Sequence, residues 1–399
     1  MPNSENICIC QEYELLKMKI LMIHPHDIYS ASEPWTIRMT SIAHEFVKKG
    51  HDVKLVYFPL SEKHRGLIKN RRINEFETIP FNRSDLHILK NIDKMIALGK
   101  WADIVHFQKC FAHASIPALF CAYANSKPVH YDWDDWEYGI YMWKPPSKLY
   151  SIYLNLFETS LPKLVDSISV SSDELSKMAV NLGFEKDKIV KANVCADLNR
   201  FRPRNNKNKL KKKYGIKGDM ILYLGQLHGA QHAEILLRAI KLANKTSPEA
   251  NYVFVGGGAD MPRLKNIASL MRINNVVFTG FLEDNKVNDY LDMADVAIAC
   301  FADNRQVRCK SPLKIAEYLA SGKAIVASSV GEIPWMIGDA GILTRPGDEE
   351  DLAKGILKII KNKKLRRELE NKARKRAQEA FNWSDVADNI LRCYQKIVF

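Results

Sequence analysis

The sequence lacks the patterns that mark several common classes of protein. Its eight cysteines, at positions 8, 10, 110, 121, 195, 300, 309 and 393, form no C-x-x-C pair, so neither a zinc site nor a disulfide framework is expected. The longest run without a charged residue, 110–126, contains a histidine, a proline and an asparagine, which favours a buried helix over a membrane span. Residues 1–15 are acidic and show no cationic-then-apolar secretory pattern, so we expect a ragged extension and a cytoplasmic protein.

Positive charge is in excess, because 59 Lys and Arg residues outnumber 46 Asp and Glu residues to give a net charge of +13. Such a balance suits an anionic partner. Much of the excess lies in 207–218 and 361–376, which we interpret as solvated faces. Since no recognition helix or RNA-binding motif accompanies them, we expect no nucleic-acid partner.

Strand and helix patterns alternate along the chain, which predicts an α/β protein with parallel sheets. In the first half the expected strands are KILMIH, DVKLVYF, ADIVHF, PVHYDW and DSISVSS. The polar and basic segment 188–209 is interpreted as a linker. A second series follows, with strands DMILYLG, NYVFVGGG, NVVFTG, DVAIAC, AIVAS and GILT.

Two such series predict two doubly wound, Rossmann-like domains that face each other across a cleft, where open parallel sheets bind ligands. We place the first domain at 1–200 and the second at 201–382. The amphipathic segment 383–399 is expected to pack back on the first domain.

The segment SPLKIAEYLASGK, from Ser311, predicts a helix of about three turns. Ser311 suits the N-cap, Pro312 the first helical position and Gly322 the residue after the end. The periodicity puts Lys314 and Glu317 on a polar face. The free N–H groups at the start, including that of Leu313, suit a diphosphate.

Arg308, Lys310 and Lys314 surround this helix start and would add to its positive potential. Glu317, one turn further, could accept hydrogen bonds from ribose hydroxyls. The alternative is a surface ion pair between Lys314 and Glu317.

The segment HYDWDDWE, from His130, places Asp132, Asp134 and Asp135 at the end of a strand. Two of these aspartates could hold a divalent metal against a nucleotide diphosphate, or one could act as a base or charge stabiliser. They could also cap the following helix. The glycine-rich VGGGAD, by contrast, lacks G-x-G-x-x-G and is interpreted as a tight turn.

Ordered blocks along nearly the whole chain resemble the retaining nucleotide-sugar glycosyltransferases of family 4, which have the GT-B fold. These blocks include KILMIHPHD, ILYLGQL, YVFVGGG, SPLKIAEYLASGKAIVASSVGEIPWMI and GILTRPGDEEDLAKGILKII. The resemblance implies that Glu317 binds the donor ribose and that the backbone of residues 311–314 meets the diphosphate. It further implies that Gly225 lets the main chain approach the phosphates, with Phe281 and Leu282 near the base.

The sequence departs from the family at several positions. Gln226 and Gln231 stand where the family usually has an arginine and a lysine that serve the diphosphate, and Arg308, Lys310 or Lys314 could replace them. The usual acidic residue eight positions before Glu317 is Cys309. Asp132 or Asp134 falls near the position of a family histidine close to the donor sugar.

These features predict transfer of a sugar, with retention, from a nucleotide diphosphate donor such as UDP or GDP to a sugar or lipid-linked acceptor. Asp132, Asp134 and Lys314 are the catalytic candidates, and no cofactor is required. Two alternatives stay open: a metal-dependent transferase that uses Asp132 and Asp134, and a degenerate protein that binds without transfer. The aromatic segment 141–157 and the basic surface suggest peripheral contact with an anionic membrane.

Overall fold

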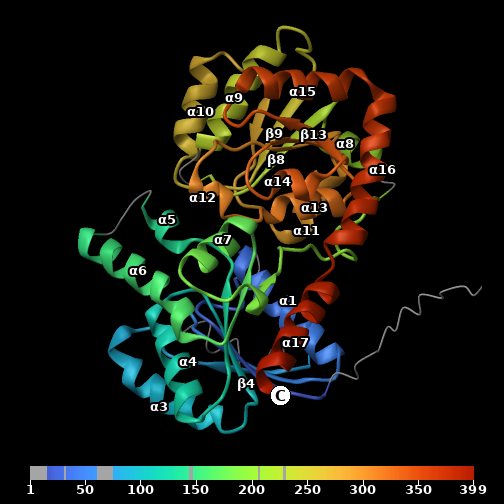
Figure 1. Ribbon diagram of the computed structural model, residues 1–399. Helices are drawn as coiled ribbons and strands as arrows, with labels where there is room; N and C mark the ends of the chain where they lie inside the picture. Colours follow the sequence, from blue (N-terminus) through green and yellow to red (C-terminus); the bar gives the residue numbers. More distant parts are fainter. Residues whose placement is uncertain (1–15, 31–32, 61–74, 143–146, 205–206, 228–230) are drawn as a thin grey trace, which may run out of the picture.

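Two parallel sheets organise the chain, the first in the lower domain of Figure 1 and the second in the upper. The computed structural model describes residues 16–30, 33–60, 75–142, 147–204, 207–227 and 231–399. The acidic extension expected at 1–15 lies outside these ranges. The predicted α/β fold with two doubly wound domains is confirmed.

The first sheet has seven strands in the order β3-β2-β1-β4-β5-β6-β7. Their bounds are β1 Lys19–His24, β2 Asp52–Tyr57, β3 Glu77–Pro80, β4 Ile104–Gln108, β5 Val129–Trp133, β6 Ser167–Val170 and β7 Ile189–Lys191. The second has six, in the order β10-β9-β8-β11-β12-β13. They are β8 Met220–Leu224, β9 Asn251–Val255, β10 Val276–Phe278, β11 Val296–Ala299, β12 Ala324–Ser328 and β13 Gly341–Thr344.

Strand order reverses at one point in each sheet, between β1 and β4 and between β8 and β11. Loops leave such neighbouring strands in opposite directions, which opens a crevice at the carboxyl ends. The central strands are buried on both faces, as their continuous apolar runs predict; Ile20, Leu21 and Met22 of β1 are all fully buried.

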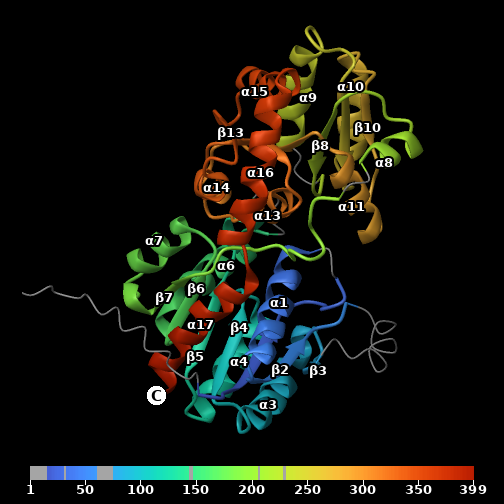
Figure 2. The same ribbon diagram turned by 90° about the vertical axis from the view of Figure 1, so that its right-hand side faces the viewer.

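Helices cover both faces of each sheet (Figures 1 and 2). Those of the lower domain are α1 Pro34–Lys48, α3 Ile88–Gly99, α4 Ala112–Ala124, α5 Glu137–Tyr141, α6 Lys148–Ser160 and α7 Asp173–Asn181, with 3-10 turns at Asp85–His87, Leu161–Leu164 and Lys186–Lys188. Those of the upper domain are α8 Lys207–Lys213, α9 Gln231–Ala243, α10 Met261–Leu270, α11 Asp284–Met293, α12 Arg305–Arg308, α13 Leu313–Ala320, α14 Ile333–Ile337, α15 Glu349–Lys361 and α16 Lys363–Ala380.

The last helix, α17 Trp383–Val398, crosses from the upper domain to the lower one and packs on α1, β6 and β7 (Figure 2). Its buried face includes Ile390, Leu391 and Tyr394. None of the helices among the described residues combines the length and apolar content needed to cross a bilayer.

The segment predicted as a polar linker is partly built into the lower domain. Its residues Ile189–Lys191 form the edge strand β7, and Ala192 and Cys195 after it are fully buried. The prediction of a linker from residue 188 was therefore wrong at its start. Asn and Lys residues dominate the composition of the segment 188–209, so its short apolar run was not recognised as a strand.

Candidate functional site

The helix that carries Lys314 begins later and is more buried than its sequence predicts. α13 spans Leu313–Ala320, and Pro312 takes the N-cap position, so the helix starts one residue later than predicted. The Ser311 hydroxyl does not cap this helix; it accepts the backbone N–H of Val194, from the segment after β7, at 3.2 Å. The first N–H groups of α13, at Leu313 and Lys314, therefore have no side-chain cap.

The face of α13 opposite its apolar side is largely buried, which argues against the alternative of a surface ion pair there. Tyr318 is fully buried and Glu317 is 9% exposed. The Tyr318 hydroxyl accepts the N–H of Leu224 at 2.8 Å and donates to the carbonyl of Ile298 at 3.3 Å. Since Leu224 ends β8 and Ile298 lies in β11, Tyr318 fixes α13 directly over the point where strand order reverses.

Lys314 lies at this crevice, and its side chain approaches Gly225. The ammonium is 4.2 Å from the centre of the Tyr223 ring and 5.5 Å from that of Phe301. A Cβ at Gly225, whose φ is +150°, would come within 2.7 Å of Lys314 Nζ. The glycine therefore leaves room for the ammonium.

Charge balance at Lys314 favours an anionic ligand. Burial, with a further contribution from the nearby Lys310, lowers the pKa of Lys314 to about 8. Among the described residues, no carboxylate forms an ion pair with Lys314 within 4.0 Å. A cation held in these surroundings at the start of a helix is suited to a phosphate.

The other predicted donor-binding residues lie around this crevice with different degrees of exposure. Gln226 is exposed just after β8, and Phe281, 71% exposed, follows the turn after β10 beside the half-buried Leu282. Lys310 is half-buried before α13. The side chain of Gln231 lies outside the described part of the chain; its backbone begins α9.

Arg308 is engaged elsewhere. Its guanidinium makes two hydrogen bonds with the carboxylate of Asp303, at 2.7 and 2.9 Å, and its side chain is half exposed. A role for Arg308 in place of the missing family cations would require it to leave Asp303. Lys314 and Lys310 are therefore better candidates than Arg308 to replace the missing cations.

His232 is a residue of the same crevice that sequence reasoning missed. Its Nδ1 accepts the N–H of Ala302 at 3.3 Å, so the proton of the neutral ring is on Nε2. Its ring contacts Phe301, with centroids 5.0 Å apart. Burial and the nearby Lys314 and Lys310 lower the pKa of His232 to about 4. The sequence signal that could have identified His232 is its position directly after Gln231, which was already predicted to lie at the donor site.

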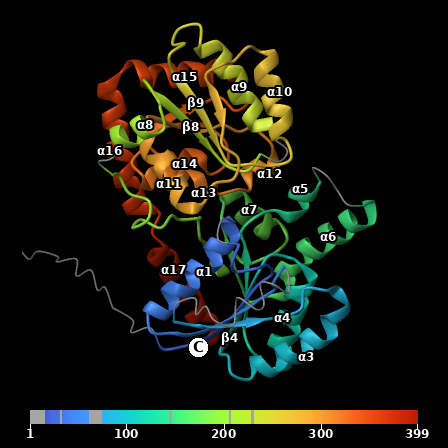
Figure 3. The ribbon, with the colours of Figure 1, turned by 180° about the vertical axis from the view of Figure 1, so that it is seen from behind.

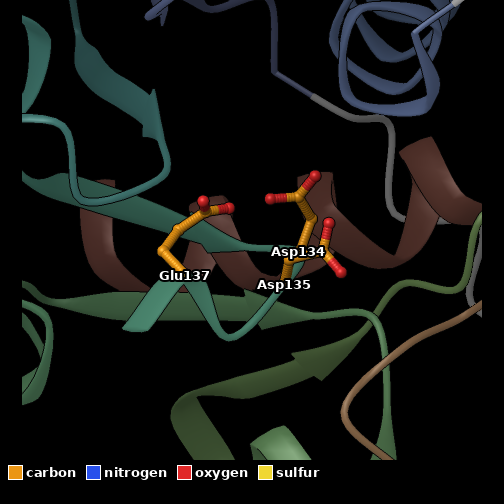
Figure 4. Close-up of side chains that lie close together, drawn as sticks. All are labelled: Asp134, Asp135 and Glu137. Atoms are coloured by element: carbon orange, nitrogen blue, oxygen red, sulfur yellow. The ribbon is translucent and has the colours of Figure 1, made fainter. Parts of the chain in front are cut away.

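The lower domain contributes a cluster of carboxylates around one buried lysine. Lys109, which follows β4, forms ion pairs with Asp134 at 3.0 Å, Asp135 at 3.4 Å and Glu137 at a shorter distance. Figure 4 shows the carboxylates of Asp134 and Glu137 directed toward the same gap, with Asp135 beside them. The Lys109 ammonium also lies 5.1 Å from the centre of the Trp35 ring.

Burial raises the pKa of Asp134 to about 7, partly offset by Lys109, while Asp135 adds to the increase. Gln108 Nε2 donates to Asp134 Oδ2 at 3.2 Å. The pKa of Glu137 is also raised by burial. A carboxyl that titrates near neutral pH suits proton transfer or the stabilisation of a developing positive charge.

The aspartates do not cap α5, which was one interpretation of their position. Glu158, on α6, accepts the N–H groups at the start of α5, those of Glu137 at 2.9 Å and Tyr138 at 2.8 Å. It also accepts Trp133 Nε1 at 2.9 Å. The capping carboxylate thus comes from a different helix, which leaves Asp134 and Asp135 for the Lys109 cluster.

Asp132 has a structural partner. It is fully buried, and Arg38 donates to both of its oxygens, from Nε at 2.8 Å and from Nη2 at 2.7 Å. Ser169 donates to it as well. The pKa of Asp132 is lowered, because Arg38 more than offsets its burial. This geometry argues against the catalytic role predicted for Asp132, since no substrate can reach it in this conformation.

The same geometry bears on the predicted metal motif, because Asp132 and Asp134 do not share a site. The described residues that could hold an ion are Asp134, Asp135 and Glu137, with ligand atoms within 4.8 Å of one another. All three already contact the Lys109 ammonium. A divalent ion would have to displace this ammonium, so the cluster fits a metal poorly.

The carboxyl ends of the two sheets meet where the domains join. Glu332, before α14, accepts the N–H of Asp173 and the side-chain amide of Asn193, and pairs with Lys191 at 2.9 Å. Arg305 of α12 stacks on Trp136, with 5.0 Å from guanidinium carbon to ring centre. The Lys109 cluster and the Lys314 crevice therefore belong to the same junction.

Comparison with known proteins agrees with this arrangement. Residues 206–376 match the family model of glycosyl transferases group 1. The structure of the Anabaena protein HepE in complex with UDP and glucose has a TM-score of 0.74 over 95% of this chain and 100% of that chain, at 16% identity. Residues 206–376 of this chain are therefore similar to the group 1 glycosyl transferases, and the chain as a whole has the GT-B fold.

Curated relatives are distant. N-acetyl-alpha-D-glucosaminyl L-malate synthase of Bacillus anthracis is 21% identical over 90% of this chain and 92% of its own. An uncharacterised glycosyltransferase of Methanocaldococcus jannaschii is 25% identical over 193 residues, 48% of each chain. The chain spans about half the length of most of the curated relatives it matches.

Proposed function

We propose that this protein transfers a sugar from a nucleoside diphosphate donor to an acceptor hydroxyl. The observation that carries the proposal is Lys314, a cation with Glu317 nearby but with no ion pair within 4.0 Å among the described residues, held at the start of α13 over the reversal point of the second sheet. Two linked phosphates at this position would neutralise the ammonium and accept the first N–H groups of the helix. The relative crystallised with UDP and glucose supports this class of donor.

The donor would extend along the second sheet. Glu317 would bind the ribose, Gly225 would allow the phosphates close to the backbone, and Phe281 with Leu282 would contact the base. The remaining neighbours of the diphosphate would be Gln226, Lys310 and the residues that lead into the helix, Ser311, Pro312 and Leu313. Lys314 would stabilise the charge that develops on the departing diphosphate.

The acceptor would lie against the lower domain. Asp134 is the catalytic candidate there, because its carboxyl lies at the junction with a pKa of about 7. We propose reaction with retention at the anomeric carbon and without a covalent enzyme intermediate. The protein would hold donor and acceptor together and stabilise charge, and the chain needs no metal for this chemistry.

We further propose a cytoplasmic protein whose acceptor is a sugar or a lipid-linked sugar, with peripheral membrane contact. The net charge of +13 and the aromatic residues of 141–157 support such contact. Residues 143–146 of that segment lie outside the described part of the chain.

A panel of nucleotide sugars tests this function directly. Thermal shift would report donor binding and the appearance of free nucleotide would report reaction, each with and without a chelator. We expect one donor class to bind and react in both conditions. Activity that disappears with chelator would favour the metal-dependent alternative, and binding without reaction would favour the degenerate protein suggested by Gln226 and Gln231.

The ribose role of Glu317 has its own test. We expect Glu317→Ala to weaken nucleotide affinity by about tenfold or more, since a charge-assisted hydrogen bond contributes about 1.5 to 3 kcal/mol. Glu350→Ala, at an exposed glutamate of α15, is the matched control and should bind normally. Unchanged affinity in Glu317→Ala would remove the residue from the donor site.

A further inference from the structure

Helix α6 has a second apolar face that no part of the described chain covers. Its inner face is buried through Ser151, Leu154 and Glu158. Its outer face carries exposed hydrophobic side chains at the spacing of one helical stripe. They are Leu149 at 81%, Ile152 at 57%, Tyr153 at 40% and Leu156 at 63% exposure.

Exposed hydrophobic residues are concentrated in this part of the molecule. Of the nineteen large hydrophobic side chains that are exposed among the described residues, ten lie between Leu86 and Leu164. Tyr123 of α4 and Leu164 adjoin the end of α6, because the Tyr123 hydroxyl donates to the Leu164 carbonyl at 2.6 Å. Together with the four outer residues of α6 they form a surface that we name the α6 face. Contiguous apolar surfaces of this kind commonly mark interaction sites.

Two lysines lie beside the outer residues of α6. In residues 147–164 the exposed charged side chains are Lys148 and Lys163, one near each end, while the exposed Asp166 lies near Tyr123 at the far end of the face. The acidic residue of this stretch, Glu158, is fully buried on the opposite side of the helix. An apolar stripe flanked by lysines complements an anionic bilayer, in which the lysines would meet lipid phosphates. A symmetric pairing of two copies through the same face would instead bring these lysines together.

The position of α6 fits a surface of this kind. In Figures 1 and 3 the helix lies at the outer edge of the lower domain, below α5, and projects sideways from it. The same helix supplies Glu158, which holds the start of α5 and so positions Glu137 of the Lys109 cluster. One side of α6 therefore carries the α6 face, and the other side supports the proposed acceptor side.

We propose that the α6 face docks on an anionic lipid bilayer and presents the protein to an acceptor anchored in that bilayer. The docking itself is independent of catalysis; its purpose rests on the proposed transferase function. Contact would be peripheral, with Leu149, Ile152 and Leu156 entering the boundary between headgroups and acyl chains.

Vesicle co-sedimentation of the full chain tests the docking. The probes are phosphatidylcholine vesicles with or without about one third phosphatidylglycerol. We expect the protein to sediment with the anionic vesicles at low salt and to be released as the salt concentration rises. The triple variant Leu149→Ser, Ile152→Ser, Leu156→Ser should lose at least about tenfold in vesicle affinity. The charge variant Lys148→Glu, Lys163→Glu should lose affinity for anionic vesicles as well.

The matched control is Leu270→Ser, Val277→Ser, which removes two hydrophobic side chains that are 76% and 54% exposed on the upper domain. This control should sediment like the unmodified protein. Failure of the unmodified protein to sediment, or equal sedimentation of all variants, would overturn the proposal. A dimer that the triple variant abolishes would assign the α6 face to a second copy instead, and would overturn it too.

Donor turnover without lipid separates this proposal from the proposed function. We expect the triple variant and the control to turn over donor at the same rate. If no preparation turns over any donor while docking depends on the α6 face, then the transferase function fails and the docking stands.

Discussion

The two halves of the junction hold buried charge in opposite ways. In the lower domain, the Lys109 ammonium is paired with the carboxylates of Asp134, Asp135 and Glu137, so this cation has partners within the protein. In the upper domain, Lys314 lies against aromatic rings and Gly225, with no carboxylate ion pair among the described residues. The lower cation is paired before any ligand arrives, whereas the upper cation is not.

This difference separates two uses of a buried ion. A paired cluster fixes side chains in position, and breaking it mainly affects the fold, because a partner is left buried and uncompensated. An unpaired cation lowers the stability of the free protein and increases its affinity for an anion. The comparison therefore predicts that equivalent lysine substitutions in the two halves have different consequences.

The largest effect is expected on the lower side. Lys109→Met should destabilise the lower domain by about 3 to 5 kcal/mol, since it leaves several carboxylates buried without their cation. Urea unfolding followed by tryptophan fluorescence would measure it. Lys188→Met, which breaks an exposed pair with Glu185, is the control and should leave stability nearly unchanged, because solvent screens that pair. Similar losses in both variants would contradict a structural role for the ion pairs of Lys109.

A smaller effect, of another kind, is expected on the upper side. Lys314→Gln should reduce nucleotide diphosphate affinity by about 10- to 150-fold, corresponding to about 1.5 to 3 kcal/mol. It should leave the unfolding midpoint unchanged or raise it, because an unpaired charge is removed. Calorimetric titration with the nucleotide and thermal unfolding of the same sample give both values. If Lys314→Gln loses stability but keeps its nucleotide affinity, then Lys314 has the structural role that we assign to Lys109.

The smallest effect is a pH dependence. The pKa of Lys314 is about 8 in the free protein, and a bound diphosphate would raise it because the charged form is favoured. Affinity should therefore be constant below about pH 8 and fall by up to tenfold per pH unit above it. Lys314→Arg, which stays charged, should bind without this decline. An equal decline in both proteins would assign the titration to another group.

Much of the fold could be predicted because the central strands are unbroken apolar runs between helical patterns. All six strands of the second sheet were predicted, and the start of α17 matches the expected segment. The missed strands are β3, ETIP, and β7, IVK, which are short and lie at the two edges of the first sheet. Edge strands need less apolar sequence, and a terminal proline is tolerated there.

The part of the site whose functional residues lie close together in the sequence could be predicted. Lys314, Glu317 and Gly225 lie around the same crevice, although no local pattern indicated that Tyr318 would be buried between two strands. Asp132 could not be told apart from Asp134 by spacing alone. β5 ends at Trp133, so Asp134 lies beyond the strand in different surroundings, whereas Asp132 lies within the strand and pairs with Arg38 of α1.

Lys109 was missed for a similar reason. It precedes its carboxylate partners by more than twenty residues, and no local pattern links them. The link is the pairing of β4 with β5, in which Gln108 lies beside Asp132 and the two strand ends come together. Residues that directly follow two neighbouring strands lie side by side. Applying this rule to β4 and β5 would have predicted that Lys109 contacts the carboxylates.

Glu332 sets a condition on how quickly the proposed transferase could work. This nearly buried carboxylate joins the upper domain to Lys191, to Asn193 and to the first N–H of α7 in the lower domain. If a spent nucleotide can escape only when the domains separate, each catalytic cycle must break and remake these contacts. The opening barrier, rather than bond cleavage, would then limit the cycle, and weakening Glu332 would make the enzyme faster.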